Sequence, residues 1–581
     1  MSAIPDFILE RLYVESSLRN TPSGWQFEVR NDLAQGSVIS ILALELDGAA
    51  QPLEGMCLLL PGSSPRPATT VTQAAPLPLP MGVSLTVQMA SAALAPGKHT
   101  LRLQLKTQEI GDLAITAADA VQQAETAPAA ATAGVAESAP VARSTDRVRV
   151  AILGAGSTVF ARQLMADTLC TPGLSEGTFA LVDIDEERLE LAHAIGEKLV
   201  EMSGAAGRWQ VEATTDRRQA LPGCDYVINT IEVAGLRNVR PDYDIPLKYG
   251  VDQCIGDTIG PGGIFKMLRT GPAWLEIARD IERLCPSALV MNYTNPMSAL
   301  TLLALRATPL QVVGLCHSVQ GTSRQLAKYL DVPYEELRWR CGGINHLAWF
   351  TELSVRGEDM YPRLRQAAQN PEIYECDPVR FEVMLHFGAF VTESSGHFSE
   401  YVPYFRKRPD LIKRYTRKGY LGESGFYANN WPSWRAASAE MIRAVLAGKS
   451  EMALKRSSEY ASTIVEARET GRPAVIHGNV LNAGLIDNLP AGGCVEVAAL
   501  VDGTGLHPIR FGPLPPQLAA LDAAHMYVHE LLVEAVLERS REAALHALLL
   551  DPLTAAVCSP AETRSMFDEM WEAEQADLAA F

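Results

Sequence analysis

The amino-acid sequence predicts an α/β protein. A Rossmann-like, doubly wound sheet should lead into a mixed α+β C-terminal domain and follow a small all-β domain. Three observations support this prediction. First, 581 residues exceed what one ordinary hydrophobic core accommodates, so several domains are expected. Second, residues 1–116 contain short runs in which apolar and polar residues alternate. Third, strand-like apolar runs alternate with helical patterns from Arg147 onward, as in a parallel sheet covered on both faces.

The first 116 residues are predicted to form an all-β accessory domain. Residues 25–31 and 99–105 alternate with period two, and clusters of Pro, Gly and Ser separate such runs, as in a small sandwich or barrel. The next segment, residues 117–145, is rich in Ala and has almost no large apolar side chains. Such a segment buries too little surface to offset the entropy lost on ordering, so it is predicted to be a linker.

Residues 146–340 are predicted to form the dinucleotide-binding domain. The expected strands are Val148–Leu153, Thr178–Asp183, Asp225–Thr230, Ala288–Tyr293 and Val312–Cys316, with a helix over Glu186–Met202. From 341 to 581 the pattern is mixed, with a strand-like run at Trp349–Val355 and a long helical stretch over Asp522–Ser540. This second region is predicted to be a mixed α/β catalytic and oligomerisation domain, and a homodimer or homotetramer is expected.

The charge and cysteine content narrow the possible partners and compartment. A net charge of −18 disfavours nucleic acid and anionic membranes, because both require clustered Lys and Arg. The first residues lack the basic start and apolar stretch of a secretory signal, and no uncharged run reaches the ~18 residues that span a bilayer. Ten cysteines without regular spacing favour reduced thiols. These features predict a cytoplasmic protein that does not bind nucleic acid or membranes.

A dinucleotide site is predicted at Gly154-Ala155-Gly156-Ser157, which follows a strand and opens a helix. The glycines let the backbone approach a pyrophosphate, and the helix N-terminus favours its negative charge. The third Gly of the usual fingerprint is missing, so a simple strand-turn-helix corner is the alternative. Asp183 ends the next strand, where an acidic residue commonly binds a ribose hydroxyl, and this favours NAD over its phosphorylated form.

Two asparagines follow a later strand in Asn292-Tyr293-Thr294-Asn295-Pro296. Asn292 is a candidate cofactor contact, and Asn295 is a candidate donor to the cofactor or to a sugar hydroxyl. The alternative is that these residues only form the turn, since Asn is a common turn residue.

Cys316 and His346 are candidate metal ligands, each expected close to the end of a strand. A thiolate and an imidazole suit Mn, Fe, Co or Zn, so the residue types alone do not select one metal. His317, beside Cys316, is a candidate sugar contact, and so is Asn345, beside His346. The alternative is that both proposed ligands are structural, which is common for a single Cys and a distant His.

These pieces together resemble the NAD- and manganese-dependent glycosidases of glycoside hydrolase family 4. The similarity extends over about 147–560 and includes many separate stretches in the same order. Within the family, Cys316-His317-Ser318 resembles the triplet of the α-galactosidase (melibiase) branch. Because some members of this family release uronic acids, an α-galacturonidase or α-glucuronidase activity is the alternative. The β-rich N-terminal region departs from the family, which normally starts at the dinucleotide strand.

The resemblance implies hydrolysis by redox-assisted elimination and addition. Bound NAD would take a hydride from C3 of the sugar, and Mn²⁺ on Cys316 and His346 would polarise the resulting carbonyl. Tyr401 matches the base that removes the C2 proton, and Asp242 matches the residue that protonates the leaving group. Asp244 is a rival for that second role. Water then adds to C1 and the hydride returns.

Other functions are considered beside the glycosidase. The residues also fit a plain NAD-dependent sugar dehydrogenase, and an inactive sugar- or NAD-sensing protein is a third hypothesis. The basic run at residues 406–408 is either a site for a substrate carboxylate or a solvated surface. The leaving group cannot be inferred from these patterns.

Overall fold

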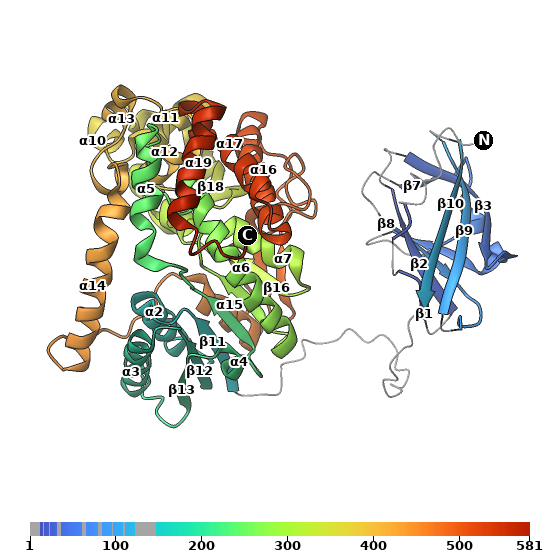
Figure 1. Ribbon diagram of the computed structural model, residues 1–581, viewed down its shortest axis with the longest axis horizontal. Coiled ribbons are helices and arrows are strands. Elements are labelled where there is room, and N and C mark those ends of the chain that lie inside the picture. Colours follow the sequence, from blue (N-terminus) through green and yellow to red (C-terminus); the bar gives the residue numbers. More distant parts are fainter. Residues whose placement is uncertain are drawn as a thin grey trace. The chain divides into compact units, whose positions relative to one another are not determined.

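The structure is a computed structural model that describes residues 12–14, 17–21, 24–31, 36–60, 65–79, 84–95, 97–108, 111–121 and 147–581. The chain divides into two compact units, Met1–Ala136 and Glu137–Phe581. Figure 1 shows both, with the N-terminal unit in blue. Within the ranges given, none of the helices has an apolar stretch long enough to cross a bilayer.

The N-terminal unit contains two antiparallel sheets. One has the order β1-β2-β8-β5-β6, and the other has β10-β9-β3-β4 with β7 beside β3. A single apolar cluster takes side chains from both, including Trp25 and Phe27 of the first and Leu103 of the second. The unit is therefore a β-sandwich, which confirms the all-β prediction. Its strands are β1 (Arg19–Thr21), β2 (Gly24–Arg30), β3 (Gly36–Leu46), β4 (Ala49–Ala50), β5 (Met56–Leu59), β6 (Arg66–Pro67), β7 (Leu77–Leu79), β8 (Ser84–Met89), β9 (Gly97–Thr107) and β10 (Gly111–Val121).

The predicted start of the linker at 117 is too early. Strand β10 pairs with β9 as far as Val121, which lies opposite Gly97 and is buried. Residues 117–121 are mostly Ala, whose small side chain makes the buried and exposed faces of a strand similar in polarity. The alternation of apolar and polar residues is therefore not visible there in the sequence. The remainder of the expected linker, 122–145, lies outside the described residues.

The larger unit is built on one 13-stranded sheet. Its order is β13-β12-β11-β14-β15-β16-β21-β22-β17-β18-β19, with β23 beside β22 and β20 beside β18. Six strands are mutually parallel and run 3-2-1-4-5-6 in chain order, as in a dinucleotide-binding sheet. The Rossmann-like prediction is thereby confirmed. These strands are β11 (Arg147–Leu153), β12 (Glu176–Val182), β13 (Trp209–Thr214), β14 (Tyr226–Asn229), β15 (Leu289–Asn292) and β16 (Gln311–Gly314).

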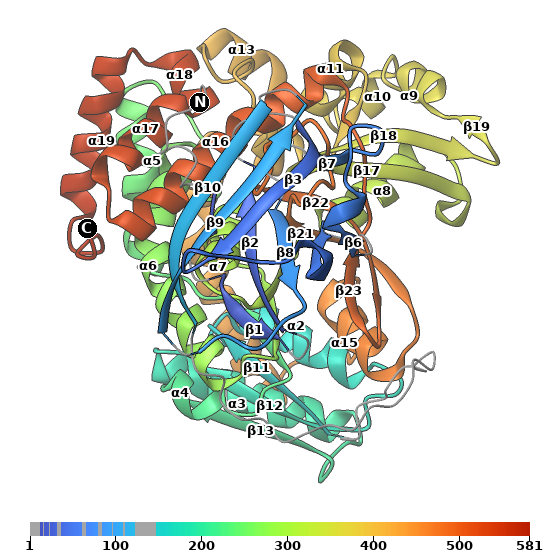
Figure 2. The same ribbon diagram turned by 90° about the vertical axis from the view of Figure 1, so that its right-hand side faces the viewer.

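The other half of this sheet is antiparallel and begins where β21 pairs with β16. The segments predicted as two domains, 146–340 and 341–581, therefore share one continuous sheet. Figure 2 shows the β17–β18 hairpin, in yellow-green, with β19 at its far end. The strands are β17 (Leu337–Ile344), β18 (Leu347–Val355), β19 (Glu358–Asp359), β20 (Phe390–Val391), β21 (Ala474–Leu481), β22 (Cys494–Asp502) and β23 (Gly505–Pro508).

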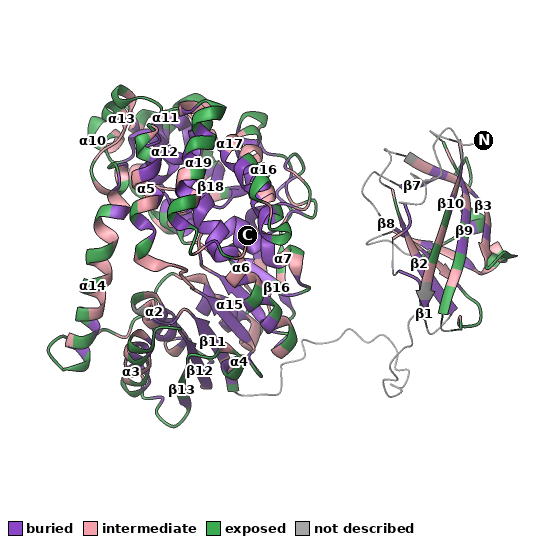
Figure 3. Ribbon diagram, viewed as in Figure 1, coloured by how far each residue is buried: buried purple, intermediate pink, exposed green. Residues whose placement is uncertain are grey.

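Both faces of the parallel half are covered. Successive residues of β11 enter different apolar clusters: Val150 and Ile152 belong to one, Ala151 and Leu153 to the other. Figure 3 shows these strands buried and the outer sides of the helices exposed. Such two-sided burial explains why the strands are nearly continuous apolar runs.

Helices pack around the sheet and supply several site residues. They are α2 (Thr158–Leu169), α3 (Glu186–Met202), α4 (Arg217–Ala220), α5 (Val239–Lys248), α6 (Gly260–Leu284), α7 (Met297–Ala307), α8 (Ser318–Tyr329), α9 (Tyr361–Ala367), α10 (Pro371–Tyr374), α11 (Pro378–Phe387), α12 (Ser395–Tyr401), α13 (Pro409–Tyr415), α14 (Phe426–Leu446), α15 (Tyr460–Thr470), α16 (Pro516–Glu538), α17 (Arg541–Leu550), α18 (Pro552–Val557) and α19 (Pro560–Glu574).

Candidate active site

A cavity of about 430 Å³ lies at the carboxyl ends of the parallel strands, where sheets of this order bind ligands. Ser157, Thr230 and Cys316, which follow β11, β14 and β16, line it. His346 and Glu393, from the antiparallel half of the unit, line it as well. The cavity therefore brings together the two regions that were predicted to carry cofactor and substrate chemistry.

The dinucleotide turn has the geometry that a pyrophosphate requires. Gly154 has a φ of 81°, and a Cβ there would lie 2.5 Å from the Thr230 carbonyl oxygen. The backbone N–H of Gly156 donates to Oδ2 of Asp183 over 2.7 Å, so the carboxylate is held beside the turn. Helix α2 begins directly afterwards, with Ser157 as its N-cap. These residues fit a dinucleotide with its ribose near Asp183.

Three side chains place metal-binding atoms close together. Sγ of Cys316 lies 3.3 Å from Nε2 of His346, which is 3.4 Å from Oε2 of Glu393. His397 joins the group, because ligand atoms of His346, Glu393 and His397 all lie within 4.8 Å of one another. Metal bonds of about 2.2 Å put neighbouring donors about 3.1–3.6 Å apart, so these spacings fit one divalent ion.

The local chain geometry explains how His346 reaches this position. Asn345 and His346 form the two-residue turn between β17 and β18, in which Ile344 pairs with Leu347. His346 has a φ of 62°, a left-handed conformation that His tolerates better than most residues. Its ring is therefore presented at the tip of a hairpin, towards Cys316.

Glu393 and His397 were not among the predicted ligands. The only sequence signal was the density of ionisable groups in Thr392–Tyr401. Although burial opposes it, the two neighbouring imidazoles of His346 and His397 lower the pKa of Glu393. Burial raises the pKa of Cys316, so its thiol must lose a proton when a metal binds.

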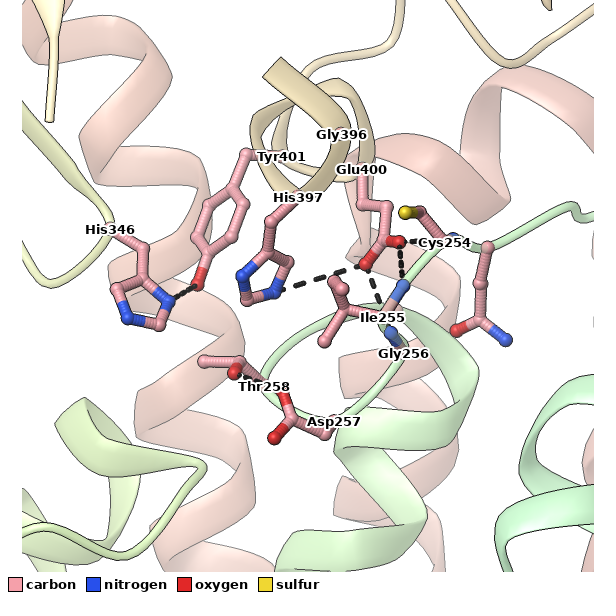
Figure 4. A network of polar contacts seen from close by, with 12 residues as sticks. Cys254, Ile255, Gly256, Asp257, Thr258, His346, Gly396, His397, Glu400 and Tyr401 are labelled. Carbon is pink, nitrogen blue, oxygen red and sulfur yellow. Dashed lines mark hydrogen bonds and ion pairs between the residues drawn. The ribbon is translucent and has the colours of Figure 1, made fainter. Parts of the chain in front are cut away.

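Tyr401 is buried at the end of α12, and its hydroxyl lies 3.4 Å from Nδ1 of His346 (Figure 4). Nε2 of His525 donates to its carbonyl over 2.7 Å, and the His525 ring centroid is 5.0 Å from the phenol ring. Burial, and then the carboxylates of Glu393 and Asp257, raise the pKa of Tyr401 well above its ordinary value. The phenol therefore keeps its proton unless a positive charge is nearby.

A buried carboxylate holds the loop before α6 against α12. Glu400 accepts hydrogen bonds from the backbone N–H groups of Cys254, Ile255 and Gly256, the last two at 2.6 and 3.1 Å (Figure 4). This loop places Asp257 in the cavity wall.

Asp257 carries a negative charge in this wall. Burial alone would raise its pKa, but Lys266 and His397 lower it to about 2. Asn295 donates from Nδ2 to Oδ2 of Asp257 over 3.1 Å. Lys266 lies 2.9 Å from Glu232, so the buried ammonium is already paired. The cavity wall therefore offers both hydrogen-bond donors and hydrogen-bond acceptors to a ligand with many hydroxyl groups.

Besides Tyr401, Gly154, Gly156 and Asp183, three expected site residues are absent from the cavity lining. Asp242 is buried beneath it in an ion pair with Arg269, at 2.6 Å. The Asn292 side chain receives a hydrogen bond from Asn229 and is wholly buried, where it holds the turn after β15. Asn345 is also buried, and its amide atoms have no hydrogen-bond partner among the described residues.

His317, expected to be a sugar contact, is exposed to the cavity. It lines the cavity as the N-cap residue of α8, and its side chain is 72% exposed. Its Nδ1 lies 3.6 Å from a carboxylate oxygen of Glu459. An imidazole with a carboxylate behind it and access to the ligand space has the donor and acceptor atoms that proton transfer to a ligand requires.

The basic run at 406–408 does not reach the cavity. Arg406 is 1% exposed and bonds through Nη2 to Asp252 at 2.9 Å. Arg408 pairs with Asp410 on the surface. Both are therefore paired outside the lining rather than offered to a substrate carboxylate.

Comparisons with known proteins agree with this arrangement. Residues 149–332 match the description "Family 4 glycosyl hydrolase", residues 341–554 match "Family 4 glycosyl hydrolase C-terminal domain", and residues 8–122 match "Hydroxymethylglutaryl-CoA reductase, N-terminal domain". An α-galactosidase of Bacillus subtilis (strain 168) is 40% identical over 431 residues, which cover 73% of this chain and 98% of that protein. An α-galacturonidase of the same strain is 31% identical over 449 residues, with 73% and 97% covered.

A solved structure of a Bacillus subtilis protein described as a glucosidase has the same fold. Its TM-score is 0.66 at 29% identity, and the similarity covers 73% of this chain and 99% of that one. The same family is indicated by two consecutive family matches, by a relative at 40% identity and by a shared fold. The chain belongs to family 4 of the glycosyl hydrolases.

Proposed function

We propose that the protein hydrolyses α-galactosides with the help of bound NAD and a divalent metal ion, for which Mn²⁺ is the expected species. One observation carries the proposal: Ser157 of the dinucleotide turn and the donors Cys316, His346 and Glu393 line the same cavity. A relative described as an α-galactosidase, at 40% identity, supports the sugar class. Ordinary two-carboxylate hydrolysis needs neither a dinucleotide turn nor a thiolate donor.

The chain supplies sites for both groups. When bound, NAD⁺ accepts a hydride from a sugar carbon, and the metal ion withdraws electron density from neighbouring sugar oxygens. Gly154, Gly156 and Asp183 fit the dinucleotide, as their turn geometry indicates. Cys316 and His346 are the proposed metal ligands, and Glu393 is near enough to join them.

Tyr401 is the proposed base that removes a proton from C2 of the sugar. Nε2 of His346 is directed at Cys316 and Glu393, so a metal there leaves the ring proton on Nδ1, which lies 3.4 Å from the Tyr401 oxygen. That N–H stabilises a phenolate. Added positive charge at the donors also offsets Glu393, one of the groups that raise the pKa of Tyr401.

His317, rather than Asp242, is proposed to protonate the leaving group. His317 lies in the cavity lining and has Glu459 behind it, whereas the Asp242 carboxylate is bound by Arg269 below the cavity. Asp244, the earlier rival, pairs with Arg240 at the surface. Cys316 and His346 line the cavity, whereas neither Asp242 nor Asp244 is among the described residues that line it.

A neutral sugar fits the charges of the cavity better than a uronic acid. Glu232, Asp257 and Glu393 bring carboxylates to the wall, and Lys266, the one Lys or Arg among the described residues that line it, is paired with Glu232. A substrate carboxylate would therefore lack a free cationic partner there. Acidic sugars are the second candidate substrate class, because a relative described as an α-galacturonidase is 31% identical.

A panel of aryl glycosides tests the proposal. The purified protein is assayed with neutral and acidic α-glycosides, with and without NAD⁺, Mn²⁺ and a reductant. We expect release of galactose that requires NAD⁺ and a divalent ion, with no net NADH. Stoichiometric accumulation of NADH with an intact glycosidic bond would instead establish a sugar dehydrogenase. Replacing Mn²⁺ by Fe²⁺, Co²⁺ or Zn²⁺ in the same assay identifies the metals that serve.

A further inference from the structure

The two proposed metal ligands come from strands that are not neighbours in the sheet. Cys316 follows β16 and His346 follows β17, while β21 and β22 lie between these strands. Neighbouring strands are about 4.8 Å apart, so β16 and β17 are about 14 Å apart across this gap. Sγ of Cys316 and Nε2 of His346 are nevertheless only 3.3 Å apart. Both segments therefore bend over the intervening strands, and residues of β21 and β22 can fix the spacing.

A row of residues crosses these four strands just below the ligands. Gly314 of β16 pairs with Asn479 of β21, Asn479 pairs with Glu496 of β22, and Glu496 pairs with Gly343 of β17. Nδ2 of Asn479 donates to the Gly314 carbonyl over 3.4 Å. Cys316 is two residues beyond one end of the row, and the hairpin turn that contains His346 begins two residues beyond the other.

The middle of this row is polar, buried and incompletely hydrogen-bonded. Glu496 and Asn479 are 0% exposed. In the part of the chain that the structure describes, both Glu496 oxygens and Oδ1 of Asn479 lack a hydrogen-bond partner of normal geometry. The amide of Asn345, in the hairpin turn, lacks one too. Apolar side chains would stabilise the fold more, so a requirement other than folding explains these groups.

The Glu496 carboxyl lies within electrostatic reach of the ligands. Burial, followed by the nearby Cys316 thiol group, raises its pKa well above the ordinary value, and His346 opposes this rise. Such a carboxyl keeps its proton and can donate one hydrogen bond as well as accept others.

We propose that Glu496 is a positioning residue of the metal site, because it stands in the paired row of residues between the end of β16 and the strand that leads to the hairpin turn bearing His346. Its buried carboxyl sets the separation between Sγ of Cys316 and Nε2 of His346. This inference rests on the metal site of the proposed function.

Two substitutions at this position test the inference in the full chain. Mn²⁺ affinity is measured by titration calorimetry, and the thermal midpoint is measured on the metal-free protein. We expect Glu496→Leu to weaken Mn²⁺ binding about 10- to 100-fold, as for other residues that support ligands, without lowering the metal-free midpoint. Glu496→Gln keeps a donor and an acceptor and should lose less than about 3-fold. Asp522→Asn is the matched control, because Asp522 is equally buried but accepts a hydrogen bond from the Trp349 indole and is not part of the row.

The possible outcomes are distinct. Unchanged Mn²⁺ affinity in Glu496→Leu overturns the inference, and so does an equal loss in Glu496→Gln, which would indicate a charge effect. A lowered metal-free midpoint in both variants, with Asp522→Asn weakening Mn²⁺ binding equally, shows a general core role and also overturns it. If the unmodified protein does not bind Mn²⁺, the metal site of the proposed function fails first and this inference fails with it.

Discussion

The hydroxyl of Tyr401 lies 3.4 Å from Nδ1 of His346, whose other ring nitrogen is directed at Cys316 and Glu393. One imidazole thus connects the proposed metal site to the proposed base. A positive charge at the donor atoms on one side of this ring therefore lowers the energy of a phenolate on the other side. The proton affinity of Tyr401 should therefore depend on whether a cation is bound.

Loss of either proposed ligand should remove activity while the fold persists. Cys316→Ser and His346→Ala are each expected to lower turnover by at least about 100-fold and to weaken Mn²⁺ binding, because a soft thiolate or an imidazole is lost. Titration calorimetry and circular dichroism check the two effects separately. Cys376→Ser, at an exposed free cysteine, is the control and should behave like the unmodified protein. Undiminished Mn²⁺ affinity in both ligand variants would refute the assignment.

Removal of the Tyr401 hydroxyl should stop proton exchange at C2 of the sugar. Tyr401→Phe keeps the buried ring but leaves His346 Nδ1 without its hydroxyl neighbour, and no base remains at that position. Mass spectrometry of galactose formed or incubated in D₂O measures the exchange. Tyr404→Phe changes a partly exposed phenol three residues away and should exchange normally. Normal exchange in Tyr401→Phe would assign the base elsewhere.

His317 and Asp242 should respond differently to the leaving group. His317→Gln is expected to lower turnover most for poor leaving groups, such as alkyl or sugar alcohols, and least for nitrophenol, which departs without protonation. Asp242→Asn should instead destabilise the fold by about 3 kcal/mol, since it leaves Arg269 with an incomplete partner set. Rates across a leaving-group series and thermal midpoints separate these effects. A steep leaving-group dependence in Asp242→Asn alone would restore Asp242 as the acid.

Alkaline pH should destabilise the protein through Glu574. This residue, at the end of α19, shares Arg269 with Asp242. Burial, then the Asp242 charge, raises the pKa of Glu574 from 4.5 to about 9. The folded state therefore holds a proton that the unfolded state releases. The contribution of this bound proton to the free energy of unfolding is complete below about pH 4.5 and is lost as the pH rises towards 9.

Thermal midpoints between pH 5 and pH 9 measure this effect. Glu574→Gln should flatten the decline, because the amide cannot ionise. Glu572→Gln, at an exposed neighbouring position, should leave the profile unchanged. Identical profiles for the unmodified protein and Glu574→Gln would contradict the raised pKa.

The parallel half of the fold follows from the sequence because its signals are local. Apolar runs that alternate with helices gave five of the six parallel strands and missed the edge strand β13 (Trp209–Thr214). The predicted helix over Glu186–Met202 has the same bounds in the structure. The Gly154 turn and Asp183 are also local to one βαβ unit. By contrast, the single sheet that unites 146–340 with 341–581 depends on pairing between β16 and β21, strands separated by more than 150 residues in sequence.

The candidate site could be predicted only in part. The residue types made Cys316 and His346 candidate ligands, the resemblance favoured the pair, and the structure brings them to 3.3 Å. Glu393, between β20 and α12, meets His346 of the β17–β18 turn, a convergence that no local pattern reveals. The burial of Asp242 depends on Arg269 and on α19, at the far end of the chain. The expected cytoplasmic location and the homodimer or homotetramer remain predictions.

The central claim is that C2 of the sugar loses its proton before the glycosidic bond breaks. Hydrolysis in D₂O, followed by mass spectrometry or NMR of the released sugar, tests it most directly. The account predicts that galactose formed by the unmodified protein with NAD⁺ and Mn²⁺ carries deuterium at C2. Galactose formed at full rate without deuterium at C2 would contradict the account and indicate hydrolysis by direct displacement at C1.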